Sequence, residues 1–173
     1  MKKILLALLF SVSLFAYPAT VVKIIDGDTI TVKSNDGNVT KLRLADIDSP
    51  EKFVISYKAK GDIKTCGKDT VNAAKLSSKY LASVIKVGDV VDVTPTGATS
   101  HDRDVAIVYY KDININEEMI QSGYAYVWHT GRDMKDIRYR EQLLQDQSLA
   151  IQAHTGLWQS YPNVMDCLTA YHK

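Results

Sequence analysis

Three short polar patches carry the residues whose types and spacing could do chemistry. Residues 26–29 read Asp-Gly-Asp-Thr, residues 43–51 hold one arginine and three carboxylates at the end of an apolar run, and residues 101–104 read His-Asp-Arg-Asp. Each patch alone is ordinary, because Asp-Gly is common in turns and charged groups often occupy solvated strand ends. Strand ends beside loops are also where a rigid scaffold holds binding groups, so the three patches together indicate more than each does alone.

Together the patches contain a set of groups sufficient to hydrolyse a phosphodiester. Asp28 and Asp48 are oxygen donors of the kind that a hard cation such as Ca²⁺ prefers. Arg43 and Arg103 can bind a phosphate through paired N–H groups and neutralise the charge that grows during in-line displacement. Glu51 can accept a proton from the attacking water as a general base. The residue types therefore predict phosphoryl chemistry.

The elements that would position these patches are strands first and helices later. Runs rich in β-branched or aromatic residues predict strands at 19–26, 28–33, 39–47, 90–93 and 103–110, with a short strand at 124–128. Apolar residues at three- and four-residue spacing predict helices at 71–85, 116–122 and 137–151, whereas residues 51–67 have no clear period and are predicted to be a loop. Five strands with about three packed helices predict an α+β domain, and a closed barrel would remove the sheet edges.

Two local expectations follow from the same patterns. In the last helix, Ile137, Leu144 and Ile151, supported by Leu143 and Ala150, are expected to form the buried seam. In the third strand, strict alternation would put Arg43 and Asp48 on opposite faces, so a bulge or a strand end must lie between them.

Length and composition predict one globular domain behind an export signal. The chain has 173 residues, 46% hydrophobic and 24% charged, which argues against a disordered chain. Met1-Lys2-Lys3 precedes an apolar stretch from Ile4 to Ala16 that is too short to span a membrane, a pattern typical of a secretory signal peptide. We expect cleavage after Ala16, a single domain at 17–173, and a periplasmic or secreted protein with no stable membrane association. Retention of the signal as an anchor is the alternative.

Export changes both the charge and the expected state of the cysteines. The formal charge of +1 becomes −1 without Lys2 and Lys3, so any nucleic-acid partner must be bound through a local basic patch. Weak long-range attraction favours single-stranded or frayed substrates. Cys66 and Cys167 are the only cysteines, and an oxidising compartment favours a disulfide between them, with two free thiols as the alternative.

The order of the motifs resembles the thermonuclease (staphylococcal-nuclease-like) family over about Ala19 to Trp158. The resemblance rests on Asp-Gly-Asp-Thr, then Arg-Leu-x-x-Ile-Asp-Ser-Pro-Glu, then the arginine that opens residues 103–110. Asn116 before Glu-Glu-Met-Ile, Ser-Gly-Tyr-Ala at 122–125 and Gly-Leu-Trp at 156–158 follow in the family's order. The resemblance implies an OB-fold barrel with packed helices and Ca²⁺-dependent hydrolysis of DNA and RNA that leaves 3′-phosphates.

Carried over by motif, the family's site residues fall on six positions of this chain. The implied Ca²⁺ ligands are Asp28, Asp48 and Ser49, the last through its backbone carbonyl. The implied catalytic residues are Arg43, Glu51 and Arg103.

Three further residues are candidates for contact with the substrate. Where many family members have Tyr-Gly before the second arginine, this chain has Ser100-His101-Asp102, and His101 can still stack or hydrogen-bond. Trp128 and His129 follow the family's matching glycine and can stack on a base, which is a sequence-tolerant contact. Packing in the core is the alternative role for these aromatic residues.

Two other classes of function are compatible with the same fold. One is a noncatalytic OB-fold protein that binds nucleic acid, which would be expected to lack some of the carboxylates or arginines present here. The other is an exported domain that Ca²⁺ merely stabilises, which has no use for two arginines. We expect a monomeric nuclease.

Overall fold

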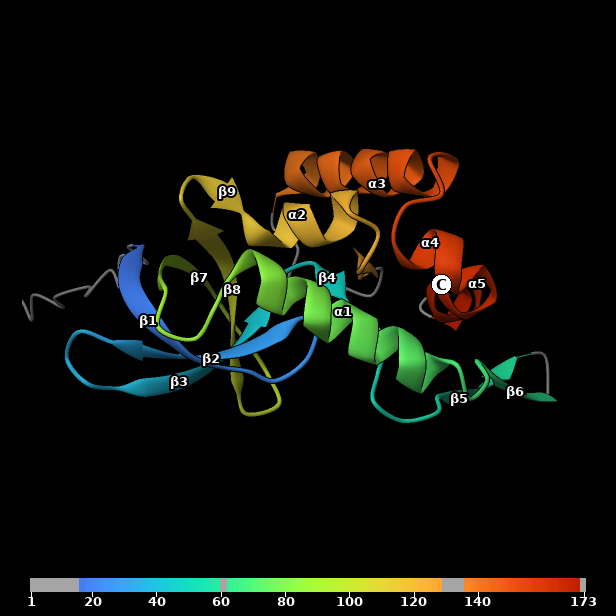
Figure 1. Cartoon of the computed structure of the whole chain (residues 1–173), viewed down its shortest axis with the longest axis horizontal. Helices are drawn as coiled ribbons and strands as arrows, with labels where there is room; N and C mark the ends of the chain where they lie inside the picture. The colour runs from blue at the N-terminus through green and yellow to red at the C-terminus, as the bar shows by residue number, and fades with distance from the viewer. Residues whose placement is uncertain (1–15, 60–61, 129–135, 172–173) are drawn as a thin grey trace, which may run out of the picture.

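A closed five-stranded barrel forms the body of the protein (Figure 1). The structure, a computed structural model, describes residues 16–59, 62–128 and 136–171. The barrel strands are β1 (Tyr17–Ile24), β2 (Thr29–Ser34), β3 (Val39–Leu44), β7 (Val90–Ser100) and β8 (Arg103–Tyr110). They pair antiparallel in the order β3-β2-β1-β7-β8, and a parallel pairing of β3 with β8 closes the barrel. The five-stranded OB-fold barrel expected from the sequence is therefore confirmed.

Alternation along the strands fills the barrel interior. Val21, Ile30, Leu42 and Val93 are almost completely buried, while neighbours such as Val22 and Val39 face solvent. Helices close the core by adding the buried residues Leu81, Ile85, Ile115, Met119, Ile120 and Leu143. Burial of each such side chain contributes about 1.5–3 kcal/mol, so the barrel is a rigid frame for the residues at its strand ends.

Five helices pack on this barrel in the ranges that the structure describes, two more than the three expected from the sequence. They are α1 (Thr70–Val84), α2 (Ile115–Gln121), α3 (Ile137–Gln152), α4 (Leu157–Ser160) and α5 (Pro162–Tyr171). Asn114 caps α2 by accepting hydrogen bonds from two backbone N–H groups of its first turn. No helix in the described part of the chain is long and apolar enough to cross a membrane. Residues 1–15 of the expected signal lie outside the described residues.

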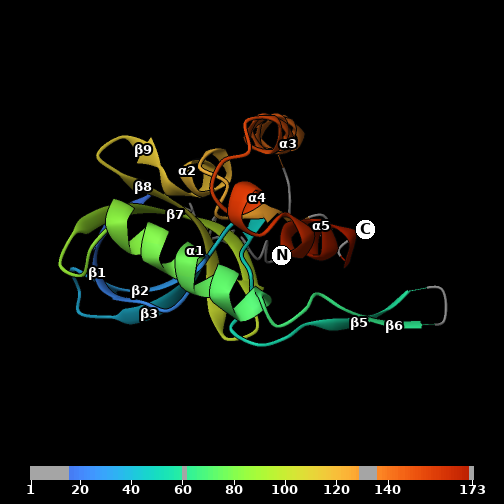
Figure 2. The same cartoon turned by 45° about the vertical axis from the view of Figure 1, so that its right-hand side comes forward.

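The segment predicted as a loop contains a hairpin, so that prediction is wrong. β5 (Ser56–Ala59) pairs antiparallel with β6 (Asp62–Thr65), and Figure 2 shows this hairpin extending away from the barrel. Its residues lack the apolar alternation that marks a half-buried strand, because they pair with each other rather than covering a core. β7 likewise runs on to Ser100, beyond the predicted end at Val93, with an irregular register between Pro95 and Thr99.

The buried face of α3 differs from the predicted seam. Leu143 and Ala150 are buried as predicted, but Ile137 and Ile151 are exposed, and the polar residues Asp146 and Gln147 are buried in their place. The polar members of this face have specific partners: Gln147 accepts a hydrogen bond from the Val127 backbone at 2.7 Å, and Asp146 accepts one from Gln121 at 3.1 Å. Apolar periodicity does not indicate the burial of Asp146 and Gln147, because these side chains are buried through hydrogen bonds to other elements.

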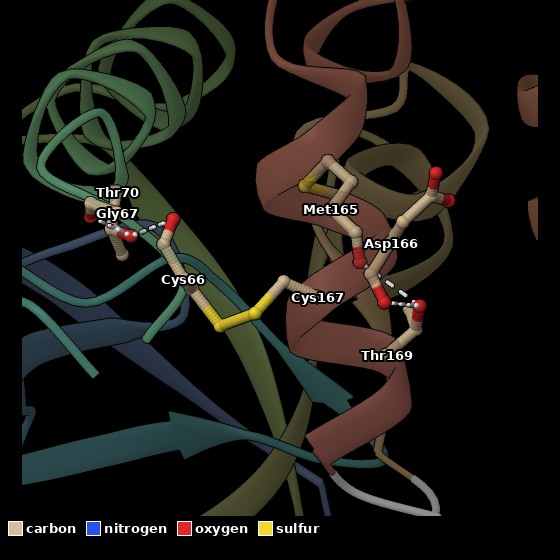
Figure 3. Close-up of a disulfide and its surroundings, with 7 residues drawn as sticks. All are labelled: Cys66, Gly67, Thr70, Met165, Asp166, Cys167 and Thr169. Atoms are coloured by element: carbon tan, nitrogen blue, oxygen red, sulfur yellow. Dashed lines mark hydrogen bonds between the residues drawn. A yellow bond between two sulfur atoms is a disulfide. The ribbon is translucent and has the colours of Figure 1, made fainter. Parts of the chain in front are cut away.

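A second apolar cluster joins the C-terminal helices to α1 and to β10 (Tyr126–Val127). It contains Ala73, Tyr126, Ala150, Leu157, Trp158, Val164, Met165 and Leu168, together with Cys66. Cys66 and Cys167 are joined by a disulfide, with Cα atoms 5.4 Å apart and a separation of 101 positions in sequence (Figure 3). The Cys66 N–H also donates to the Ile55 carbonyl at 3.0 Å, so the bridge ties the base of the β5–β6 hairpin to α5.

Removing the disulfide is expected to destabilise the protein. Reduction, or the double change Cys66→Ala and Cys167→Ala, should lower the free energy of unfolding by about 2–5 kcal/mol, because a crosslink across so long a loop restricts the unfolded chain. Urea unfolding with and without reductant measures the effect. The double variant is the control, since reductant should not change it. An unfolding midpoint of the wild type that is insensitive to reductant would contradict the expectation.

Candidate active site

Arg43 lies between two buried carboxylates contributed by different segments. Its Nη1 atom is 3.1 Å from Oδ1 of Asp28, which precedes β2, and its Nη2 atom is 2.5 Å from Oδ1 of Asp48, in the short strand β4 (Ile47–Asp48). Asp28 also accepts hydrogen bonds from the Ser49 backbone N–H at 2.8 Å and the Thr29 hydroxyl at 2.8 Å. The three charged residues form one buried cluster.

The strand end required by the sequence pattern lies between Arg43 and Asp48. β3 ends at Leu44, and Asp46 adopts a left-handed backbone conformation with φ of 62° before β4 begins. This turn breaks the strict alternation, so both side chains reach the same cluster. The predicted third strand at 39–47 is thus two elements rather than one.

Buried side chains that the sequence analysis did not select hold this turn in place. Asn116 donates to the Ala45 carbonyl at 3.0 Å and accepts from the Val108 backbone at 3.1 Å, which joins the turn to β8. The Tyr126 hydroxyl, in β10 (Tyr126–Val127), donates to Oδ2 of Asp48 at 2.6 Å, and β10 pairs with β4. Asn116 lies in a motif of the resemblance and Tyr126 directly follows another, but only the fold brings them to the turn.

Gly27 is required by close packing rather than by its backbone conformation. A Cβ atom at this position would lie 1.9 Å from the Ser77 Oγ and 2.9 Å from the Ser49 Cβ. Ser77 belongs to α1 and donates to the Tyr124 carbonyl at 2.7 Å. The Asp-Gly-Asp-Thr turn is therefore packed between α1 and Ser49, the residue that follows β4.

Arg103 reaches the cluster through Thr29. At the start of β8, its Nη1 donates to the Thr29 hydroxyl at 3.0 Å, and its Nε donates to the Ser100 carbonyl at 3.3 Å. Within the described residues no ion pair to a carboxylate neutralises Arg103. A guanidinium whose partners are all neutral oxygen atoms has no ion pair to break before it binds an anion.

Glu51 is half-buried beside this cluster. The pKa of its carboxyl is raised by burial and by the negative charges of Asp48 and Asp26, while Arg43 and Arg103 oppose the shift. A carboxylate with a raised pKa is a better proton acceptor, which suits a general base.

Burial makes the charge of the cluster costly and favours an added cation. Burial raises the pKa of Asp28 to about 8 despite the opposing charge of Arg43, and the charge of Asp48 raises it further. Burial also raises the pKa of Tyr126 well above its usual value, and Asp48 adds to that shift. With both carboxylates ionised, the cluster would carry one more negative than positive charge, and a hard cation in this all-oxygen donor set would favour that ionised form.

The cation would have to use backbone as well as carboxylate oxygens. Among the described residues, no group of three or more His, Cys, Asp or Glu side chains lies close enough to hold a metal ion. Asp28, Asp48 and the Ser49 carbonyl are the donors that the family resemblance implies, and the Ser49 backbone N–H lies 2.8 Å from Oδ2 of Asp28.

The three candidates for substrate contact are placed differently. Trp128 is half-buried, with its ring centroid 5.5 Å from the Arg43 Cζ. His101 is exposed in the β7–β8 turn with φ of 56°, and within the described residues no hydrogen bond links it to the cluster. His129 lies outside the described residues. Their roles in binding substrate stay predictions.

An OB-fold barrel that gathers two arginines and three carboxylates at its strand ends belongs to a class of domain suited to binding phosphate. Residues 41–160 match the model of the staphylococcal nuclease homologue family. The chain belongs to this family, and the recognition made from its motifs is confirmed.

Three relatives match the chain at about 30% identity. An uncharacterized endonuclease of Haemophilus influenzae is 32% identical over 138 residues, which is 80% of this chain and 64% of the relative. Endonuclease YhcR of Bacillus subtilis is 30% identical over 118 residues, 65% of this chain and 9% of the relative. The uncharacterized lipoprotein MG186 of Mycoplasma genitalium is 30% identical over 107 residues, 58% of this chain and 40% of the relative. The chain spans less than two thirds of the length of each.

Substitution of Gly27 should destabilise the fold at the site. Gly27→Ala forces its new methyl group against Ser77 and Ser49, and such overpacking costs about 1–3 kcal/mol in the free energy of unfolding. Thermal and urea unfolding measure the loss. A second change, Ser77→Gly, removes the closest contacts of the new methyl group. The double variant should therefore be more stable than the sum of the two single changes predicts, where Ser77→Gly alone carries the cost of a glycine inside a helix. If the two changes are simply additive, the packing explanation is wrong.

Proposed function

We propose that the protein is an exported, Ca²⁺-dependent nuclease that hydrolyses phosphodiester bonds of DNA and RNA and leaves 3′-phosphates. The observation that carries the proposal is a continuous set of hydrogen bonds, from Arg103 through Thr29 to Asp28, and from Arg43 to both Asp28 and Asp48. It holds two guanidinium groups, two carboxylates and the nearby Glu51 in one place. The membership of a nuclease family and the endonuclease names of two relatives support the same class of reaction.

Each residue has a distinct task in the proposed reaction. Asp28, Asp48 and the Ser49 carbonyl would hold Ca²⁺, which supplies Lewis-acid stabilisation of the phosphate. Arg103, whose charge no described carboxylate neutralises, binds a non-bridging oxygen and stabilises the charge that develops there.

Two further residues prepare the site for the attacking water. Glu51 accepts a proton from this water, aided by its raised pKa. Arg43 is fixed by its two ion pairs and by Trp128, so its remaining donor capacity is oriented in advance.

Export is part of the proposal because of the N-terminal pattern. A basic head and a short apolar run precede Tyr17, and one relative carries the name of a lipoprotein. The protein for assay is therefore purified from the exported fraction, where its N-terminus should be Tyr17 and its mass that of a monomer.

Cleavage should depend on Ca²⁺. Plasmid DNA and RNA incubated with the exported protein should be degraded with Ca²⁺ and remain intact with a chelator, and the new ends should carry 3′-phosphates. As a second readout, Ca²⁺ should raise the melting temperature of the wild type, since a ligand at 100 times its Kd adds about 2.7 kcal/mol of stability. Asp48→Asn should lose that shift. Binding without cleavage would favour a noncatalytic nucleic-acid protein; a Ca²⁺ shift without either would favour a structural role for the ion.

Glu51 and Arg103 should each be necessary for turnover. Glu51→Gln should lower kcat by about 10²–10⁴-fold, because it removes the proton acceptor without changing the shape of the side chain. Arg103→Gln should lower it by about 10²–10³-fold through loss of charge stabilisation. The matched controls are Glu141→Gln and Arg138→Gln, both on the exposed face of α3. Full activity in either site variant would refute the role given to that residue.

A further inference from the structure

The basic charge of the protein is concentrated in one stretch of the chain. Residues 52–86 hold eight lysines and two aspartates, whereas the rest of residues 17–173 holds 11 basic and 18 acidic residues. The stretch covers the β5–β6 hairpin, which extends away from the barrel, and α1, which packs against the barrel (Figures 1 and 2). A protein that is slightly acidic after export thus has one strongly basic region.

Four exposed lysines lie on or beside α1. Lys75 and Lys79 are one turn apart on the same face of the helix, whereas Lys68 precedes the helix and Lys86 follows it. The opposite side of α1 is buried through residues such as Ala74 and Leu81. The 15 residues of α1 span about 22 Å, which is the length of roughly six base pairs.

The stability of the helix does not explain these lysines. α1 contains no acidic residue, so Lys75 and Lys79 at i and i+4 repel each other on its surface. Lys68 lies near the N-terminal end, where the helix dipole disfavours a positive charge. Among the described residues, none of the four lysines takes part in an ion pair. Their arrangement suits a polyanion outside the protein.

We infer that the lysine face at α1, formed by Lys68, Lys75, Lys79 and Lys86, binds the sugar–phosphate backbone of a long polynucleotide away from the scissile bond. The inference rests on the proposed nuclease function and extends it from a local site to a substrate path. The basic stretch begins at Lys52, directly after Glu51, and α1 packs on the Asp28 turn through Ser77, so the face belongs to the same rigid unit as the site.

An anionic lipid surface is the competing partner and fits less well. Helices that lie on membranes combine basic residues with large apolar residues in contact with lipid. The large exposed hydrophobic residues of the described chain include none from α1. Lys75 and Lys79 thus lie on a helix without large exposed apolar residues, although Val87 beside Lys86 is exposed, and this arrangement matches a phosphate backbone, which is bound by counterion release.

The test compares long and short substrates. The surface variant carries Lys68→Gln, Lys75→Gln and Lys79→Gln; the matched control carries Lys23→Gln, Lys33→Gln and Lys111→Gln, also exposed but on other elements. For the surface variant, the ratio of kcat/KM on a 30-nucleotide DNA to that on a dinucleotide should fall about tenfold or more. The slope of log(kcat/KM) against log[KCl] should flatten by about 2–3, at 0.7–0.9 per lost phosphate contact. The control should resemble the wild type.

A surface variant indistinguishable from the control variant in both readouts would overturn the inference. If the wild type cleaves nothing, the proposed function fails separately, and equilibrium binding of the same DNA in chelator still tests the lysine face. Loss of affinity in the surface variant alone then supports the face, and equal affinity refutes it. Binding to vesicles rich in anionic lipid that is lost in the surface variant, with DNA affinity retained, would also overturn it. Thermal unfolding confirms that both variants are folded.

Discussion

The ion pairs of Arg43 with Asp28 and Asp48 are the interaction on which the rest of the structure depends. These residues come from β3, from the turn before β2 and from β4, so the pairs form only when the barrel has brought three segments together. Removing one partner of a buried pair leaves an unpaired charge and commonly costs about 3–5 kcal/mol. The cluster therefore depends on three features of its surroundings: a turn after Leu44, a close approach of α1 at Gly27, and the Tyr126 hydroxyl that donates to Asp48.

The second apolar cluster positions the hydroxyl that donates to Asp48. Tyr126 has its ring among the residues that surround the Cys66–Cys167 disulfide and its hydroxyl on Asp48. The C-terminal helices are thus connected to the charged cluster by one side chain. The glycine motifs serve the same packing, because a Cβ at Gly123 would lie 2.4 Å from the Thr155 carbonyl oxygen and one at Gly156 would lie 2.3 Å from the Ser122 carbonyl oxygen. The Ser-Gly-Tyr and Gly-Leu-Trp motifs touch each other.

Charge is distributed unevenly at two scales. Inside the barrel, two buried carboxylates, when both are ionised, exceed one guanidinium, and a bound cation would favour that ionised form. On the surface, an acidic body carries a basic hairpin and helix between residues 52 and 86. The formal net charge of the protein, which is close to zero, therefore describes neither the charge at the site nor the charge of residues 52–86. The electrostatic attraction of a polyanion depends on these local charges.

Local sequence was enough to predict the five barrel strands, the first three helices and the family, because alternation, periodicity and short motifs are encoded in neighbouring residues. It also indicated that the chain must turn between Arg43 and Asp48. The β5–β6 hairpin was missed because its strands lack apolar alternation, and α5 was missed because its apolar residues find their partners across the fold. The buried face of α3 was assigned wrongly in part, because Asp146 and Gln147 are buried by hydrogen bonds rather than by apolar character. Sequence by itself determined which chemical groups are present; only the tertiary structure decided that Thr29, Asn116 and Tyr126 hold them, because those contacts join residues up to 78 positions apart.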